Sequence, residues 1–177
     1  MENISTINNS YHPFKWENIG DIKDGRSDLG EEMPVLVYRL TLYTVFDVLV
    51  RDFGKEKANY YMREAGRLAG SELARTLLDL TLPLNKFIAN LQQALLDLKI
   101  GILRVEATDE DTKGIVLTVA QDLDCSGLPI DEGNVCNYDE GFLTGILEKY
   151  TGKSYTVREI DCWASGDRVC RFDCRVI

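Results

Sequence analysis

Residues 157–177 read VREIDCWASGDRVCRFDCRVI, and this stretch decides the fold at the carboxy-terminal end of the chain. Cys, Phe and Val alternate with Arg and Asp between residues 170 and 176. A period of two is typical of an antiparallel strand with one buried face. The Ser-Gly-Asp sequence at 165–167 favours a turn. We therefore predict a hairpin formed by strands 154–163 and 168–177.

A helix and a second hairpin are expected upstream of this hairpin. Residues 137–150 carry an apolar face, with Asn137 and Glu140 spaced as an N-cap and its third-position partner, and Gly152 follows the segment. Residues 101–107 and 114–120 are β-rich and are joined by a polar segment. The inserted helix should thus lie between two hairpins in the sequence.

Three helices are expected before the first hairpin, at residues 34–53, 55–80 and 84–98, because apolar residues recur there at steps of three and four. Gly66 and Gly70 lie one turn apart in the second helix and would let another helix approach closely.

This order of elements predicts an α+β fold. N-terminal helices should pack on one face of an antiparallel sheet of four or more strands, with one helix inserted between the two hairpins. Residues 1–33 show no sustained period, and we expect them to form a leader that packs irregularly. Residues 34–177 should form a single ligand-binding domain.

The composition excludes some classes of function. The chain has 177 residues, with 20 Lys and Arg against 29 Asp and Glu and a formal net charge of −9. This disfavours nucleic-acid binding. Arg39 and Asp47 interrupt the longest apolar stretch, so a membrane span is not expected, and the polar start of the chain is unlike a secretory signal. We expect a cytoplasmic protein.

Catalysis finds little support in the sequence. His12 is the one histidine, and no G-x-S-x-G, H-E-x-x-H or G-x-G-x-x-G motif occurs. We assign no catalytic residue and expect a protein that is not an enzyme.

A metal site is the main chemical hypothesis. Cys162 and Cys170 flank the turn of the last hairpin and should lie opposite each other. Glu159 can join them only if its strand bulges. Cys136 at the foot of the inserted helix would complete a Cys₃Glu set suited to structural zinc. Cys125 stays outside this set, as does Cys174.

Two other interpretations of these cysteines remain open from spacing alone. They could be ordinary buried thiols, because free cysteine is among the most buried residue types. They could also form a reversible disulfide, between Cys162 and Cys170 or between Cys125 and Cys136, and so act as a redox switch.

Two segments resemble the carboxy-terminal signature of the 4-vinyl reductase domain family. They are GFLTGILEKYTGK at 141–153 and VREIDCWASGDRVCRFD at 157–173, and the resemblance extends more loosely to LGEEMPVLVYRL at 29–40. That family includes sensor domains of phenol-responsive transcription activators, and its fold is similar to that of the TRAPP vesicle-trafficking subunits.

The resemblance implies a zinc ion held by Cys136, Glu159, Cys162 and Cys170, a hydrophobic or aromatic small-molecule ligand, a homodimer and a regulatory protein partner. The phenol sensors hold the phenolic hydroxyl with a His and a Trp that have no counterpart here. The family name also implies an alternative function, a reductase acting on a tetrapyrrole or aromatic substrate.

A ligand should lie between the helices and the sheet, and the helix at 34–53 contributes polar groups unusual for a core. Polar groups in an apolar wall are typical of ligand pockets. We assign to this pocket the residues Tyr38, Arg39, Tyr43, Phe46 and Phe87, of which the two Phe also suit the core.

Overall fold

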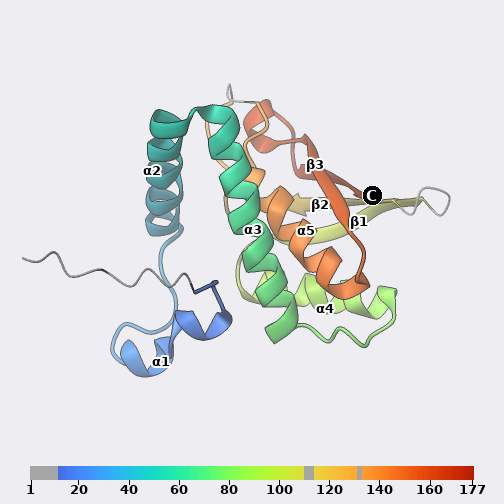
Figure 1. Cartoon of the computed structure of the whole chain (residues 1–177), viewed down its shortest axis with the longest axis horizontal. Coiled ribbons are helices and arrows are strands. Elements are labelled where there is room, and N and C mark those ends of the chain that lie inside the picture. Colours follow the sequence, from blue (N-terminus) through green and yellow to red (C-terminus); the bar gives the residue numbers. More distant parts are fainter. Residues whose placement is uncertain (1–11, 110–113, 131–132) are drawn as a thin grey trace, which may run out of the picture.

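The structure, a computed structural model, describes residues 12–109, 114–130 and 133–177 (Figure 1). Its helices are α1 (Ile22–Gly25), α2 (Val35–Phe53), α3 (Lys55–Leu77), α4 (Leu84–Asp97) and α5 (Asn137–Thr151), with 3-10 turns η1 (Trp16–Ile19) and η2 (Trp163–Ser165). Its strands are β1 (Ile102–Asp109), β2 (Gly114–Ala120), β3 (Tyr155–Asp161) and β4 (Cys170–Val176).

The four strands form one antiparallel sheet in the order β1-β2-β4-β3. Each hairpin supplies two neighbouring strands, and α5 lies between the hairpins in the sequence. The predicted α+β class is therefore confirmed. None of the helices in the described part of the chain is long and apolar enough to span a membrane.

The helices are stacked outward from one face of the sheet. α5 lies over the sheet, α3 packs against α5, and α2 lies on the outer side of α3 (Figure 1). α4 lies beside β1, where the Gln92 side-chain amide donates to the Leu103 carbonyl oxygen at 3.1 Å. The core between these layers includes Phe87, Leu91 and Phe172, all fully buried.

The predicted helix ends are close to the observed ones, with one difference at α3. The helix ends at Leu77 rather than at residue 80, because Leu78 is extended. Asp79 then accepts hydrogen bonds from the backbone N–H and the hydroxyl of Thr81, at 2.9 and 2.6 Å. Such an Asx turn competes with helix continuation.

The first described residues are attached to the domain through one aromatic side chain. Trp16 packs against the core, and its backbone N–H donates to the Glu72 carboxylate at 2.8 Å. Residues 20–36 are exposed.

Four glycines let α3 and α5 run in contact at the level of the backbone. A Cβ on Gly66 or Gly70 would overlap the carbonyl oxygen of Tyr138 or Phe142, and Gly141 and Gly145 meet α3 carbonyl oxygens in the same way. The close approach expected from Gly66 and Gly70 is confirmed. This contact fixes where α5 begins.

Replacing Gly70 by Ala should push the two helices apart. We expect the free energy of unfolding to fall by about 3 kcal/mol, because the backbone carbonyl of Phe142 cannot yield as a flexible side chain would. Gly25→Ala is the control, since nothing lies within 4 Å of its added Cβ and φ is not positive there. Chemical denaturation measures both variants, and equal stabilities would contradict the account.

Candidate metal centre and adjoining cavity

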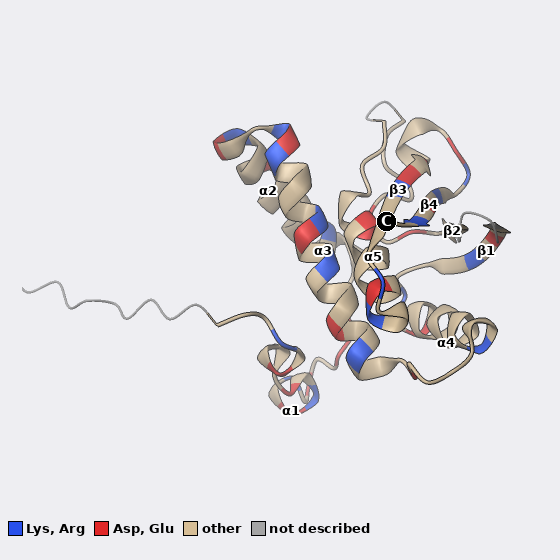
Figure 2. Cartoon of the chain, turned by 45° about the vertical axis from the view of Figure 1, so that its right-hand side comes forward, with Lys and Arg blue, Asp and Glu red and all other residues tan. Residues whose placement is uncertain are grey.

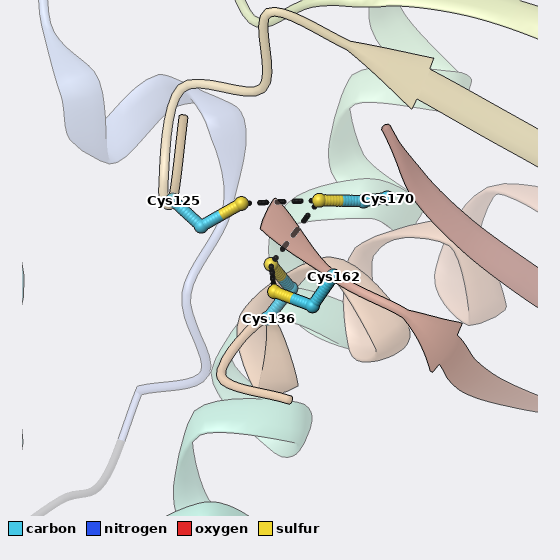
Figure 3. Close-up of side chains that lie close together, drawn as sticks. All are labelled: Cys125, Cys136, Cys162 and Cys170. Atoms are coloured by element: carbon cyan, nitrogen blue, oxygen red, sulfur yellow. Dashed lines mark hydrogen bonds between the residues drawn. The ribbon is translucent and has the colours of Figure 1, made fainter. Parts of the chain in front are cut away.

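Four buried cysteines converge from four separate segments at one end of the sheet. Cys125 lies in the loop after β2, Cys136 immediately precedes α5, Cys162 follows β3 and Cys170 begins β4 (Figure 3). Their Sγ atoms all lie within 4.8 Å of one another.

The sulfur geometry suits a tetrahedral metal. The Cys136 Sγ lies 3.8 Å from the Sγ of both Cys162 and Cys170. A zinc–sulfur bond of about 2.3 Å in a tetrahedron places neighbouring sulfurs about 3.8 Å apart. The donor set therefore fits zinc in a closed, structural site. Cys125 Sγ lies closer to Cys170 Sγ, at 3.0 Å.

Glu159 lies beside the same cluster through a local irregularity of β3. The pairing register of β3 with β4 shifts between Glu159 and Asp161, which is the bulge that the sequence argument requires. The Glu159 side chain is 7% exposed, and its Oε2 accepts the Cys136 backbone N–H at 3.1 Å. Its Oε1 is buried without a hydrogen-bond partner.

Two four-ligand sets are therefore compatible with the structure. Both contain Cys136, Cys162 and Cys170, and the fourth place goes either to Glu159, as the resemblance implies, or to Cys125. Spacing alone leaves Cys125 out, because its loop is irregular. The one sequence signal is its position between acidic and polar residues in QDLDCSG, directly after a strand.

The thiols strongly affect one another's ionisation. Hydrogen bonds with neighbouring thiols, that with Cys125 foremost, raise the pKa of Cys136 and lower the pKa of Cys162. Burial raises the pKa of Glu159 to about 8. By contrast Cys174, which lies outside the cluster, has its pKa raised to about 12 chiefly by burial. A divalent cation would allow the clustered thiols to ionise together.

Three buried aspartates add further negative charge next to the thiols. Asp122 Oδ1 accepts the backbone N–H groups of Asp124 and Cys125, at 2.9 and 3.1 Å, and so shapes the Cys125 loop. Asp139 is 8% exposed and its Oδ2 has no hydrogen-bond partner. Burial, followed by the charges of Asp122 and Asp124, raises the pKa of Asp139.

α2 holds the Cys125 loop from the other side. The Tyr38 hydroxyl donates to Asp124 Oδ1 at 2.7 Å, and the Tyr43 hydroxyl donates to the Asp124 carbonyl oxygen at 3.0 Å. Arg39 donates to the carbonyl oxygens of Leu123 and Ser126 at 2.8 and 2.9 Å. The polar residues predicted to face a ligand thus anchor the loop that carries Cys125.

A cavity of about 520 Å³ lies next to this loop, between α2, the start of α3 and the segment before α5. Tyr43, Phe46 and Tyr138 supply aromatic walls, and Asp124 and Asn59 supply polar groups. Of the five residues assigned to the pocket, Tyr43 and Phe46 line it. Tyr38 and Arg39 touch its loop, and Phe87 lies elsewhere, stacked on Tyr150 in the core.

The family comparison decides what kind of domain this is. Residues 115–176 match the model of the vinyl-4-reductase domain, which is the 4-vinyl reductase family named above, and they include all the candidate metal ligands. Residues 115–176 form a 4-vinyl reductase domain. The resemblance found in the sequence is confirmed for this part of the chain, whereas α2 and α3, which form much of the cavity, precede the matched residues.

Three solved structures are similar to the chain in fold. The phenol-responsive sensory domain of the transcription activator PoxR, solved with phenol, matches with a TM-score of 0.62 and 19% identity, over 84% of this chain and 79% of that one. A vinyl-4-reductase family protein from Methanocaldococcus jannaschii has a TM-score of 0.62 and 16% identity, covering 94% and 99% of the two chains. A trafficking protein particle complex subunit 3 from Naegleria fowleri, covalently bound to palmitic acid, has a TM-score of 0.60 and 12% identity, over 80% and 96%.

A curated relative is closer in sequence. The uncharacterized protein MJ1642 of Methanocaldococcus jannaschii is 31% identical over 74 residues, which are 42% of this chain and 45% of that protein. The chain spans about half the length of the curated relatives it matches, 45% of this protein and 58% of a second one.

Cys170→Ser should remove the metal and destabilise the protein by on the order of 5 kcal/mol, since the binding energy of a structural metal is part of the folding energy. Cys174→Ser is a matched control, because Cys174 lies on the same strand, is equally buried and is outside the cluster. It should keep its zinc. Elemental analysis and thermal denaturation measure both, and a Cys170→Ser protein with full zinc content would refute the site.

Proposed function

We propose that the chain is a small-molecule sensor module, with a ligand cavity that adjoins a structural zinc site. The observation that carries this proposal is that the cavity and the thiol cluster share their walls. Asp124 lines the cavity and Cys125 follows it, and Val135 and Asn137 line the cavity on either side of Cys136. A ligand that fills the cavity would press on the two segments that hold these thiols.

Zinc would brace this arrangement rather than react. Cys136, Cys162 and Cys170 would be three ligands, and we propose Cys125 as the fourth, because its Sγ lies within 4.8 Å of the other three. Glu159, the fourth ligand expected from the resemblance, would then support the site by accepting the Cys136 N–H. The ion, when bound, supplies the positive charge that lets the thiols stay ionised and buried.

A ligand-binding role is also compatible with the size and composition of the cavity. A volume of about 520 Å³ lies in the range of small-molecule sites, and its walls are mostly apolar with a few polar groups. PoxR, of the same fold, has a phenol-responsive sensory domain. The ligand of this chain would be a hydrophobic or aromatic small molecule.

A homodimer remains part of the proposal. α2 exposes apolar side chains over 42–68% of their surface, namely Leu36, Val37, Leu40, Val45, Val48 and Phe53. Contiguous exposed apolar surface of this kind marks interaction sites, and two-fold dimers are the commonest oligomers. Sedimentation equilibrium should give twice the chain mass, and a monomer at micromolar concentration would contradict it. A regulatory protein partner stays a prediction.

A thiol redox switch is the second candidate, favoured by the 3.0 Å approach of the Cys125 and Cys170 sulfurs. A peroxide would take two hydrogens from the two thiols, form the disulfide and leave as water. Intact mass of the metal-free protein should then fall by about two daltons and recover with a reductant. Retention of both thiols under mild peroxide would exclude this candidate. The reductase interpretation rests on the family name and gains no separate support from the described residues.

Filling the cavity should abolish ligand binding. Val50 lines the cavity, and Val50→Trp should weaken the binding of 4-ethylphenol, a neutral aromatic probe, at least about tenfold by taking its space. Leu68→Trp is the control, because it adds a Trp to an exposed position of α3 that is not among the residues lining the cavity. Isothermal calorimetry measures both, and equal affinities would place the ligand elsewhere.

A further inference from the structure

The unused hydrogen-bonding groups of the cavity are acceptors. Asn59 Oδ1 is buried without a hydrogen-bond partner. The Asp124 carboxyl group is 5% exposed and receives the Tyr38 hydroxyl on Oδ1. A buried acceptor without a partner is costly, so a ligand that donates hydrogen bonds would gain from this site.

The other two amides in the wall are already engaged in both directions. Asn134 donates to the Glu159 carbonyl oxygen at 2.7 Å and accepts from the Ser165 hydroxyl at 3.0 Å. Asn137 accepts from Arg63 at 2.6 Å and donates to the Val135 carbonyl oxygen at 3.4 Å. They leave the balance of free groups on the acceptor side.

The charge behind the wall is negative as well. Asp122 and Asp139 are buried near Asp124, and their charges raise one another's pKa values after burial itself. The guanidinium of Arg39 is nearby but donates to main-chain carbonyl oxygens of the loop. At the exposed edge Asp47 and Lys55 carry opposite charges.

Charge of this kind is not a general feature of the surface around the cavity. Figure 2 shows basic and acidic residues interspersed along α3, with neither sign gathered into a patch. The excess of negative charge at the cavity therefore comes from the buried aspartates. A cation that enters the cavity approaches them where screening by water is weakest.

The aromatic walls suit such a cation. Tyr43, Phe46 and Tyr138 all line the cavity. A cation over the face of an aromatic ring is attracted by its quadrupole, and aromatic-lined sites recognise ammonium groups in this way. We propose that the cavity binds a small organic cation, with an ammonium group next to the Asp124 carboxylate and Asn59 and an apolar body against the aromatic walls. This inference rests on the proposed function of the same cavity.

Three probes of nearly equal size test the charge preference on the full chain. They are phenethylammonium, neutral 4-ethylphenol and anionic 3-phenylpropionate, measured by isothermal calorimetry at about pH 8, where the amine is protonated and the phenol is neutral. We expect phenethylammonium to bind at least about tenfold more tightly than 4-ethylphenol, and 3-phenylpropionate to bind most weakly.

Two variants that remove the same charge locate the interaction. Asp124→Asn should lower the preference for phenethylammonium over 4-ethylphenol by about tenfold, because it removes a buried charge while its side-chain oxygen can still accept the Tyr38 hydroxyl. Asp47→Asn should change the preference by less than about twofold, since Asp47 is exposed. Asn59→Leu leaves the charge unchanged and should weaken phenethylammonium binding more than 4-ethylphenol binding. Circular dichroism and zinc content show whether each variant is folded.

Each result bears on the inference. If 4-ethylphenol binds as tightly as phenethylammonium, the cation inference is wrong and the cavity still holds small molecules. If Asp47→Asn and Asp124→Asn have equal effects, surface charge attracts the cation and the assignment to the buried aspartate is wrong. If none of the three probes binds, the proposed sensor function fails together with the inference.

Discussion

The burial of four thiols at one point is the constraint on which the rest of the structure depends. Cys125, Cys136, Cys162 and Cys170 come from segments far apart in the chain, and each is fully or almost fully buried. Four thiols this close cannot all ionise without a compensating charge, and a tetrahedral dication supplies one. The position of α5, the bulge in β3 and the loop after β2 all serve to bring these sulfurs together.

The glycine contact and the thiol cluster locate the two ends of the same helix face. Close packing of α3 on α5 fixes α5 over the sheet, and Cys136 directly precedes the first turn of α5. Asp124 and Val135 then connect the cluster to the cavity under α2. A change in the cavity therefore has a short physical route to the metal ligands, which is what a sensor with a structural metal requires.

The sequence predicted those features that depend on local periodicity and spacing. The order of helices and strands, the close approach at Gly66 and Gly70 and the need for a bulge at Glu159 all follow from side chains within one or two elements. The position of Cys125 could not be predicted, because the Asp122 side chain and a positive φ at Gln121 set its loop, and neither is periodic. Phe87 has the right period for a buried residue, but periodicity does not tell the core from a cavity.

The most direct test of the central claim is X-ray absorption at the zinc edge of the purified protein, together with its metal content. The account predicts one zinc per chain with four sulfur neighbours at about 2.3 Å. Three sulfurs and one oxygen would assign the fourth position to Glu159 rather than Cys125. A protein that folds stably without any bound metal would contradict the account.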